Sequence, residues 1–207
     1  MIQNRAKIIG ITGGIATGKS TAVEVIKSRG YLVVDADQVA KDVVKKGQEG
    51  LEKIKEKFGY DILLGNGELD RKKLAEIIFR SEEKRKELNE ILHPMIIENI
   101  IQNVNEHILD EDVIFIDIPL LFETREILTD RGLVLDEIWL VYCDEKKQID
   151  RLMKRDGIDY EYALKKIKSQ LDLNYKKDNS DVIIYNNGSL EELEETIDTL
   201  LRKLRCD

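Results

Sequence analysis

The chain contains 207 residues, of which 42% are hydrophobic and 36% are charged, and its formal net charge is -8. This length supports one α/β domain with a small insertion, and the acidic balance argues against nucleic acid as the main partner. No apolar run is long enough to span a bilayer, and the first residues are polar, so we expect a cytoplasmic protein with no membrane association. Cys143 and Cys206 show no metal-ligand spacing, so we expect one buried cysteine and one tail cysteine.

The first predicted strand, residues 8–12, runs through a glycine-rich turn into a predicted helix at residues 19–28. The turn fits G-x-x-x-x-G-K-[ST] between a strand and a helix, which is the context that a phosphate-binding loop requires. Its amides can surround a phosphate, Lys19 can reach the outer phosphates, and the Ser20 hydroxyl can ligate Mg2+. A turn without a ligand is the alternative, but the complete motif favours nucleoside triphosphate binding. The predicted nucleotide-binding residues are Gly13, Gly14, Ile15, Ala16, Thr17, Gly18, Lys19, Ser20 and Thr21.

A second apolar run, residues 31–34, predicts a buried strand that ends in Asp35, Ala36 and Asp37. Open α/β sheets bind their ligands at the carboxyl ends of the strands, so these two acids are candidates for the site. Asp35 has an alternative role as the cap of the helix that follows. We do not expect both acids to be caps.

Residues 38–107 show mainly helical patterns and no strong strand signal. We expect short helices near 39–44 and 51–58, a turn or small hairpin at 62–67, and a helix capped by Asp70. Ser81 is expected to cap a helix that ends near His93, and Pro94 is expected to stand in the first turn of another. Residues 38–109 exceed a minimal crossover, so we expect a substrate-binding helical insertion.

Three further apolar runs predict strands at 113–116, 138–142 and 182–185. The first ends in Asp117, which resembles the Walker B arrangement in which a carboxylate helps to hold Mg2+. Ser189 and Glu192 form a capping box for the last helix. Five strands separated by helices predict an α/β three-layer fold with a doubly wound, five-stranded parallel sheet. Its core comprises residues 1–37, 110–143 and 180–207.

Between the last two predicted strands, residues 144–179 predict a pair of helices. Asp144 is expected to cap the first helix, which carries Arg151 and Arg155, and Gly157 to end it; the second is expected over 160–171. Arginines suit bidentate phosphate contacts, so this segment predicts a lid. An exposed charged hairpin is the alternative.

A phosphate-binding loop alone does not separate kinases, switches and motors. A guanine-nucleotide switch should carry D-x-x-G, which this sequence lacks, and a nucleic-acid motor needs a longer chain and usually a basic surface. A small-molecule kinase accounts for the strand-end acids, the insertion and the lid. Nothing in the sequence indicates an obligate protein partner.

These segments, taken in order, closely resemble the dephospho-CoA kinase family over essentially the full chain. The similar motifs are GGIATGKST, VVDADQVAKDVV, FGYDILLGNGELDRKKLAEIIF, LHPMI, DIPLLFE, QIDRLMKRDG, Gln170 and the late Asn186-x-Gly188. The chain departs from the family in having Ala16-Thr17 where Gly-Ser is frequent, which should preserve the amide geometry. It also has Ser180-Asp181 in place of Ala-Asp.

The resemblance implies transfer of the ATP γ-phosphoryl group to the ribose 3′-hydroxyl of dephospho-coenzyme A, with Mg2+. It implies that Asp37 is the general base, that Lys19 holds the donor phosphates, and that Ser20 and Asp117 serve the metal. Arg151 and Arg155 match lid arginines that clamp phosphate, and Asn186 and Gly188 match a segment near the adenine. The implied substrate-binding residues are Asp35, Asp37, Phe58, Arg71, His93, Pro119 and Leu120. The alternatives are another P-loop kinase, acting on nucleosides or nucleoside monophosphates, and a nucleotide-binding regulatory module.

Overall fold

A computed structural model describes residues 5–204, in which five strands form one sheet with the order β2-β3-β1-β4-β5. All neighbouring strands are parallel, as the sequence predicted. Their bounds are Lys7–Gly13 (β1), Leu32–Asp35 (β2), Val113–Asp117 (β3), Glu137–Tyr142 (β4) and Val182–Tyr185 (β5). β1 lies at the centre, so the loop that follows it opens in the middle of the carboxyl edge. Cys143 is buried, as expected, whereas Cys206 lies outside the described residues.

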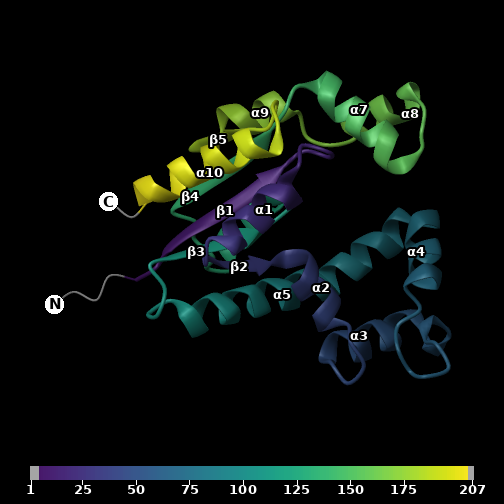
Figure 1. The fold of residues 1–207 in the computed structure, drawn as a ribbon. Coiled ribbons are helices and arrows are strands. Elements are labelled where there is room, and N and C mark those ends of the chain that lie inside the picture. Colours follow the sequence, from purple (N-terminus) through teal and green to yellow (C-terminus); the bar gives the residue numbers. More distant parts are fainter. Residues whose placement is uncertain (1–4, 205–207) are drawn as a thin grey trace.

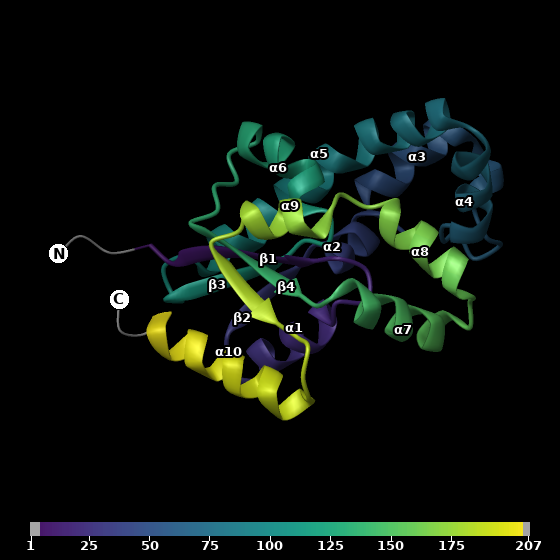
Figure 2. The same cartoon turned by 90° about the horizontal axis from the view of Figure 1, so that it is seen from above.

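Helices cover both faces of the sheet, because successive strand residues point to opposite faces and nearly all are apolar. Ile9, Ile11 and Phe115 pack against α1 (Lys19–Ser28) and α10 (Leu190–Leu204). On the other face, Ile8 and Ile114 pack against α5 (Glu82–His107) and α6 (Leu121–Asp130). The two layers are visible in Figures 1 and 2. The bounds of α1 match the prediction, whereas α6 was not predicted from the sequence.

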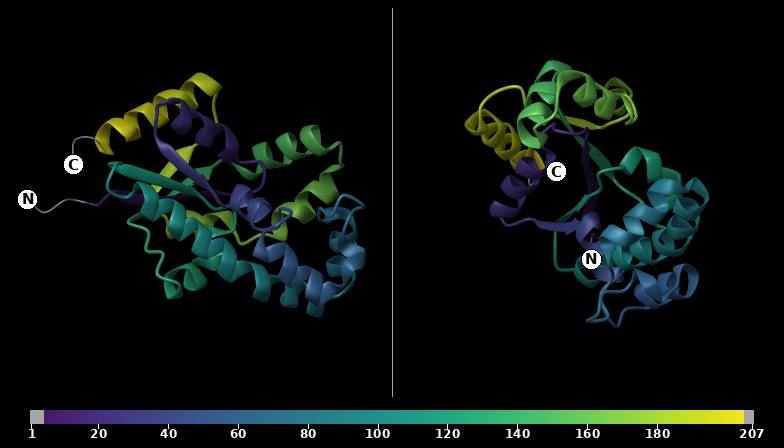
Figure 3. Two further views of the ribbon diagram at one scale, coloured as in Figure 1. Left: turned by 90° about the horizontal axis from the view of Figure 1, so that it is seen from below. Right: turned by 90° about the vertical axis from the view of Figure 1, so that its right-hand side faces the viewer.

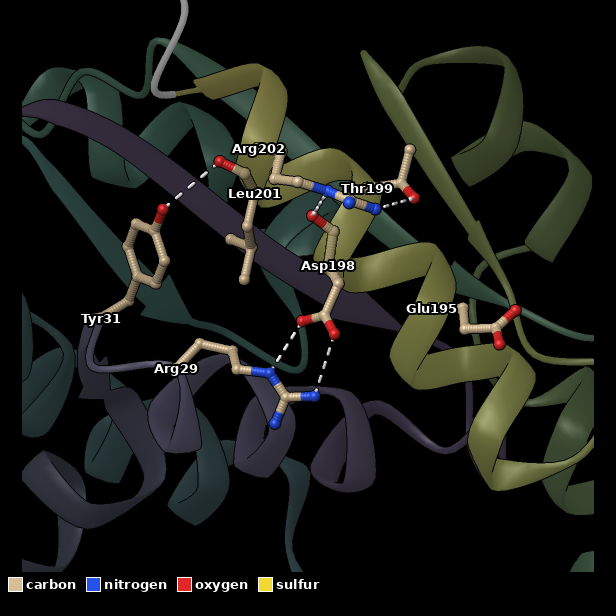
Figure 4. A pocket seen from close by; sticks show the side chains of 7 residues that line it. All are labelled: Arg29, Tyr31, Glu195, Asp198, Thr199, Leu201 and Arg202. Carbon is tan, nitrogen blue, oxygen red and sulfur yellow. Dashed lines mark hydrogen bonds and ion pairs between the residues drawn. The ribbon is translucent and has the colours of Figure 1, made fainter.

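A polar contact joins α1 to α10 on the first face (Figure 4). The Arg29 guanidinium donates two hydrogen bonds to the Asp198 carboxylate, at 2.7 Å and 3.1 Å. Arg202 and Tyr31 donate to backbone carbonyls of α10. These side chains line a surface hollow of about 600 Å³ at the end of α1 that is remote from the phosphate loop. Because the charged groups pair across the two helices, we interpret the contact as structural.

Residues 36–81 form a helical layer with its own hydrophobic cluster, which includes Leu51, Ile54 and Leu74. Its elements are α2 (Ala36–Val43), α3 (Glu49–Phe58), a short 3-10 turn at Tyr60–Ile62 and α4 (Arg71–Arg80). A single antiparallel bridge between Leu63 and Leu69 corresponds to the expected small turn. The Asp70 carboxylate caps α4, as predicted.

The expected break at Pro94 is wrong, because α5 runs without interruption from Glu82 to His107. Ser81 caps it as predicted. A proline inside a helix removes one hydrogen bond and costs about 3 kcal/mol. Packing on both sides of Pro94 offsets this cost, since Leu88 belongs to the cluster of the helical layer and Ile97 and Ile100 belong to the main core. Tertiary burial therefore overrides the local stop signal.

The segment before β5 folds as three helices rather than two: α7 (Glu145–Asp156), α8 (Tyr160–Lys168) and the short α9 (Leu173–Asp178). The expected helix over 160–171 is therefore too long. Asp144 stands at the N-cap position of α7, as expected, but its side chain makes no capping hydrogen bond. Gly157 ends α7 in the left-handed conformation, as expected. Figures 1 and 3 show the α7–α8 hairpin and the helical layer extending beyond the same end of the sheet.

Candidate active site

The phosphate loop leaves β1 at Gly13 and enters α1 at Gly18, whose φ of 90° is favourable only for glycine. The buried Thr17 hydroxyl donates to the Gly14 carbonyl at 2.9 Å and closes the loop on itself. A Cβ atom at Gly13 would lie 2.6 Å from this hydroxyl oxygen. The loop is therefore compact, and its glycines stand where a side chain would not fit.

Asn186 and Arg151 hold the carboxyl end of the loop from outside. The Asn186 side-chain amide donates to the Thr17 carbonyl at 2.8 Å, and an Arg151 Nη donates to the same oxygen at 3.2 Å. The other Arg151 Nη donates to the Asn186 carbonyl at 3.1 Å. The structure thus brings both residues, which were predicted to serve the nucleotide, directly to the loop.

Two glutamines, for which no role was predicted from the sequence, hold the middle of the loop. Gln148 Nε2 donates to the Ile15 carbonyl at 2.9 Å, while the Ile15 amide donates to Gln170 Oε1 at 2.7 Å. A signal for Gln148 was present, because it stands four residues before Leu152 on the buried face of α7. A polar side chain at such a position requires a hydrogen-bond partner.

Three carboxylates gather at the carboxyl edge of the sheet. Asp117 ends β3, lies opposite Asp35 in the register, and forms a partly buried ion pair with Lys19 of the loop. Burial raises the pKa of the Asp117 carboxyl, and the hydrogen bond from Lys19 works against that rise. The charges of Asp35 and Asp37 also raise this pKa, which indicates that both acids lie nearby. The strand-end acids and the loop lysine thus share one region.

Asp35 and Asp37 have different roles in the structure. The Asp35 carboxylate caps α2 by accepting from the Gln38 amide at 2.9 Å. Asp37, in the first turn of α2, is exposed and lines a cavity of about 240 Å³. His93, Pro119 and Leu120, three of the implied substrate-binding residues, line the same cavity, and its wall is completed mainly by apolar side chains of α5 and α6.

Two other implied substrate-binding residues, Phe58 and Arg71, are not among the side chains that line this cavity. The Phe58 ring packs in the helical layer, with Lys84 Nζ 5.7 Å from its centre. Arg71 donates to the Lys41 carbonyl at 3.3 Å and so links α4 to α2. In the described chain, both belong to the helical layer rather than to the edge of the sheet.

Arg155 and Gly188 also make local contacts rather than contacts with the loop. Arg155 Nε donates to Asp156 Oδ1 at 2.7 Å on the exposed side of α7. Gly188 allows the predicted capping box of α10, since a Cβ there would lie 1.4 Å from a Glu192 carboxylate oxygen. That same oxygen accepts from the Ser189 amide at 2.9 Å, and the Ser189 hydroxyl accepts from the Glu192 amide.

The oxygen donors at the loop suit Mg2+ in combination with phosphates. Ser20 is exposed in the first turn of α1, next to Lys19, which pairs with Asp117. Among residues 5–204, no group of three or more His, Cys, Asp or Glu side chains is placed to hold a metal by itself. Mg2+ commonly takes one or two protein oxygens together with substrate phosphates, so one hydroxyl and one carboxylate fit this ion. Within the same range, no helix has the length and apolar character needed to cross a membrane.

Comparison with known proteins gives a consistent result. A model of the dephospho-CoA kinase family matches residues 7–192. A dephospho-CoA kinase of Enterococcus faecalis is 42% identical over 191 residues, covering 92% of this chain and 94% of that protein. One of Oryza sativa is 44% identical over 203 residues, covering 96% and 84%. The solved dephospho-CoA kinase from Campylobacter jejuni superimposes with a TM-score of 0.68 at 27% identity, covering 96% and 97%. The chain therefore belongs to the dephospho-CoA kinase family.

Proposed function

We propose that this chain transfers the γ-phosphoryl group of ATP to the ribose 3′-hydroxyl of dephospho-coenzyme A, giving coenzyme A and ADP. One observation carries the proposal: the phosphate loop and the Asp37 cavity lie at the same edge of the sheet, where the Asp37 charge acts on Asp117, the residue that pairs with Lys19 of the loop. The phosphate loop and the Asp37 carboxylate, which lines a mainly apolar cavity, therefore lie in the same region. The acceptor is a small molecule, and the proposal includes a cytoplasmic location with no nucleic-acid, membrane or obligate protein partner.

In the proposed reaction, Asp37 accepts a hydrogen bond from the acceptor hydroxyl and receives its proton as the oxygen attacks the γ-phosphorus in line. Phosphoryl transfer depends mainly on positioning and on charge neutralisation, which are the roles of the loop amides and Lys19. The apolar wall of the cavity, formed by residues such as Ile97 and Ile118, would pack against the acceptor and exclude water. Partial burial of Lys19 beside the loop strengthens its attraction to phosphate.

Mg2+ is proposed to be held by the Ser20 hydroxyl, with Asp117 orienting its water shell, and it would neutralise charge on the ATP phosphates. We further propose residues 144–179 as a lid, in which Arg151 and Arg155 clamp phosphate, and residues 38–109 as the acceptor-binding insertion, including Phe58 and Arg71. Asn186 and Gly188 are proposed to lie beside the adenine.

A coupled ADP-release assay with a panel of acceptors tests the reaction. Dephospho-coenzyme A should be turned over, whereas nucleosides and nucleoside monophosphates should give little or no product. Turnover of a monophosphate without turnover of dephospho-coenzyme A would reject the assignment in favour of another P-loop kinase. Binding of ATP without turnover of any acceptor would favour a regulatory module.

The Asp37→Asn substitution tests the base. We expect kcat to fall by at least about 100-fold, because general base catalysis contributes factors of this size, with ATP affinity nearly unchanged. Asp42→Asn is the matched control: it removes a carboxylate of the same helix that pairs with Lys45 at the surface, so turnover should persist. If Asp37→Asn retains wild-type turnover, Asp37 is not the base.

The Lys19→Ala substitution tests the donor site. It should weaken ATP binding and lower kcat together, because Lys19 is proposed to hold the same phosphates in the bound state and in the transition state. ATP affinity is measured by calorimetry and kcat by the coupled assay. An effect on kcat with no change in ATP affinity would contradict this role.

A further inference from the structure

One residue of the phosphate loop, Ile15, is held by two side chains from the segment between β4 and β5. Gln148 Nε2 donates to the Ile15 carbonyl at 2.9 Å, and the Ile15 amide donates to Gln170 Oε1 at 2.7 Å. Both distances are normal for N–H···O bonds. Gln148 lies in the first turn of α7 and Gln170 follows α8, so the two glutamines lie where the α7–α8 hairpin begins and ends.

The backbone of Ile15 decides which end of each side-chain amide faces the loop. An amide N–H only donates and a carbonyl only accepts, so Gln170 must present its oxygen and Gln148 its nitrogen. Gln148 is only 3% exposed, so water has little access to replace its bond to the loop. The two side chains therefore have opposite chemical requirements, although they are the same residue type.

The neighbouring residue explains why the loop needs this support. Ala16 adopts a φ of 58°, and it is the one non-glycine residue with a positive φ in the described chain. An L-residue in this conformation persists only when its surroundings determine it. Ile15 is fixed by the two glutamines before Ala16, and the Thr17 carbonyl is fixed by Asn186 and Arg151 after it. The strained residue is thus pinned from both sides.

We propose that Gln148 and Gln170 are positioning residues, together called the glutamine clamp, that hold the loop in its phosphate-binding shape and couple it to the α7–α8 hairpin. Because side chains at both ends of the hairpin bond to one residue, a movement of the hairpin relative to the sheet must strain or break a bond to Ile15. Nucleotide binding and hairpin position should therefore bias each other. This inference rests on nucleotide binding at the loop and is independent of which acceptor is phosphorylated.

Two substitutions with the same change in size and charge test the clamp. Gln170→Glu keeps an oxygen that accepts from the Ile15 amide, whereas Gln148→Glu places a carboxylate against the Ile15 carbonyl and loses the bond. We expect the Kd for ADP, measured by calorimetry, to rise less than about 3-fold in Gln170→Glu and at least about 10-fold in Gln148→Glu, since a lost buried hydrogen bond has an effect of this order. Gln48→Glu, on the exposed cap of α3, controls for added charge.

Hydrogen exchange distinguishes coupling between the loop and the hairpin from a purely structural role of the two glutamines, because a purely structural role would not make the exchange of α8 depend on ADP. In the wild type, saturating ADP should slow amide exchange in α8, and this protection should disappear in Gln148→Glu while the exchange of β3 stays unchanged. If Gln148→Glu fails to fold, Gln170→Leu and Gln170→Glu form the test: Leu should weaken ADP binding and uncouple α8, and Glu should restore both.

Equal ADP affinities of the two Glu variants would overturn the clamp, as would ADP protection of α8 that survives the loss of either bond. A protein that binds ADP with these mutational effects but does not phosphorylate dephospho-coenzyme A would retain the clamp and refute only the proposed acceptor. The two proposals therefore fail separately.

Discussion

Replacing Gly18 by alanine should destabilise the protein through two separable effects. The first is backbone strain, because φ is 90° at this position and an L-residue there costs about 1–2 kcal/mol. The second is a clash, because the new Cβ would lie 2.1 Å from Asn186 Nδ2. Asn186 is buried and would have to give up its 2.8 Å bond to the Thr17 carbonyl, at a further cost of about 1–3 kcal/mol. The expected total is about 2–5 kcal/mol.

Gly30→Ala is the matched control for this substitution. Gly30 has nearly the same φ, 86°, but an added Cβ would meet no atom within 4 Å. It should therefore show only the backbone strain, about 1–2 kcal/mol. Urea unfolding at equal m-values measures both free energies of unfolding, and the difference between the variants should be about 1–3 kcal/mol, the part assigned to the clash. For a chain of this size, each 1 kcal/mol lowers Tm by about 2–4 °C.

A third variant isolates the clash. In an Asn186→Ala background, the obstructing amide is absent, so the additional cost of Gly18→Ala should fall to the value of Gly30→Ala. Such non-additivity is expected for residues in contact. If Gly18→Ala is no less stable than Gly30→Ala, or if its cost is unchanged in the Asn186→Ala background, the account of Asn186 as a close support of the loop is wrong.

Two further predictions concern ion pairs outside the loop. Lys176 is fully buried and pairs with the partly exposed Glu123 at 2.8 Å. Glu123→Gln leaves a buried charge without its partner and should lower the free energy of unfolding in urea by about 3–5 kcal/mol, whereas Lys176→Met should lower it clearly less. A larger loss in Lys176→Met than in Glu123→Gln would contradict this explanation. The hydrogen bonds from Arg155 and Lys166 hold the pKa of Asp156 at about 2, below its ordinary value of 3.8. Because the folded-state pKa of Asp156 is depressed, the contribution of its two ion pairs to stability should be present above about pH 4 and lost as the pH falls towards 2. Asp156→Asn should therefore flatten the Tm profile in that window at low salt, and identical profiles would refute the linkage.

Most of the fold was predictable from the sequence, because its signals are local. Parallel strands covered on both faces consist of nearly continuous apolar residues, and all five such runs became strands of the sheet. The caps at Asp70 and Ser81 and the Ser189–Glu192 box involve partners three residues away, so the sequence displays both members of each pair. The helix stop at Gly157 is local in the same sense.

The candidate site was predictable in its parts but not in its connections. The motif identified the loop, and the apolar strands placed Asp37 and Asp117 at the correct edge. The sequence offered Asp35 as a helix cap and indicated that the two acids would not both be caps, and the structure confirms this. It did not indicate that Asp37 would stay exposed on the wall of a cavity. That division depends on the direction in which α2 leaves β2.

The sequence by itself determined the five strands, most of the helices and the position of the phosphate-binding loop, since these depend on chemistry within a few residues. Only the tertiary structure decided that α5 continues through Pro94, that Lys19 pairs with Asp117, and that Gln148 and Gln170 grip Ile15. The bond between Gln170 and Ile15 joins residues 155 positions apart. Such contacts exist only after the sheet has brought distant segments together, because no local pattern encodes which buried donor meets which acceptor.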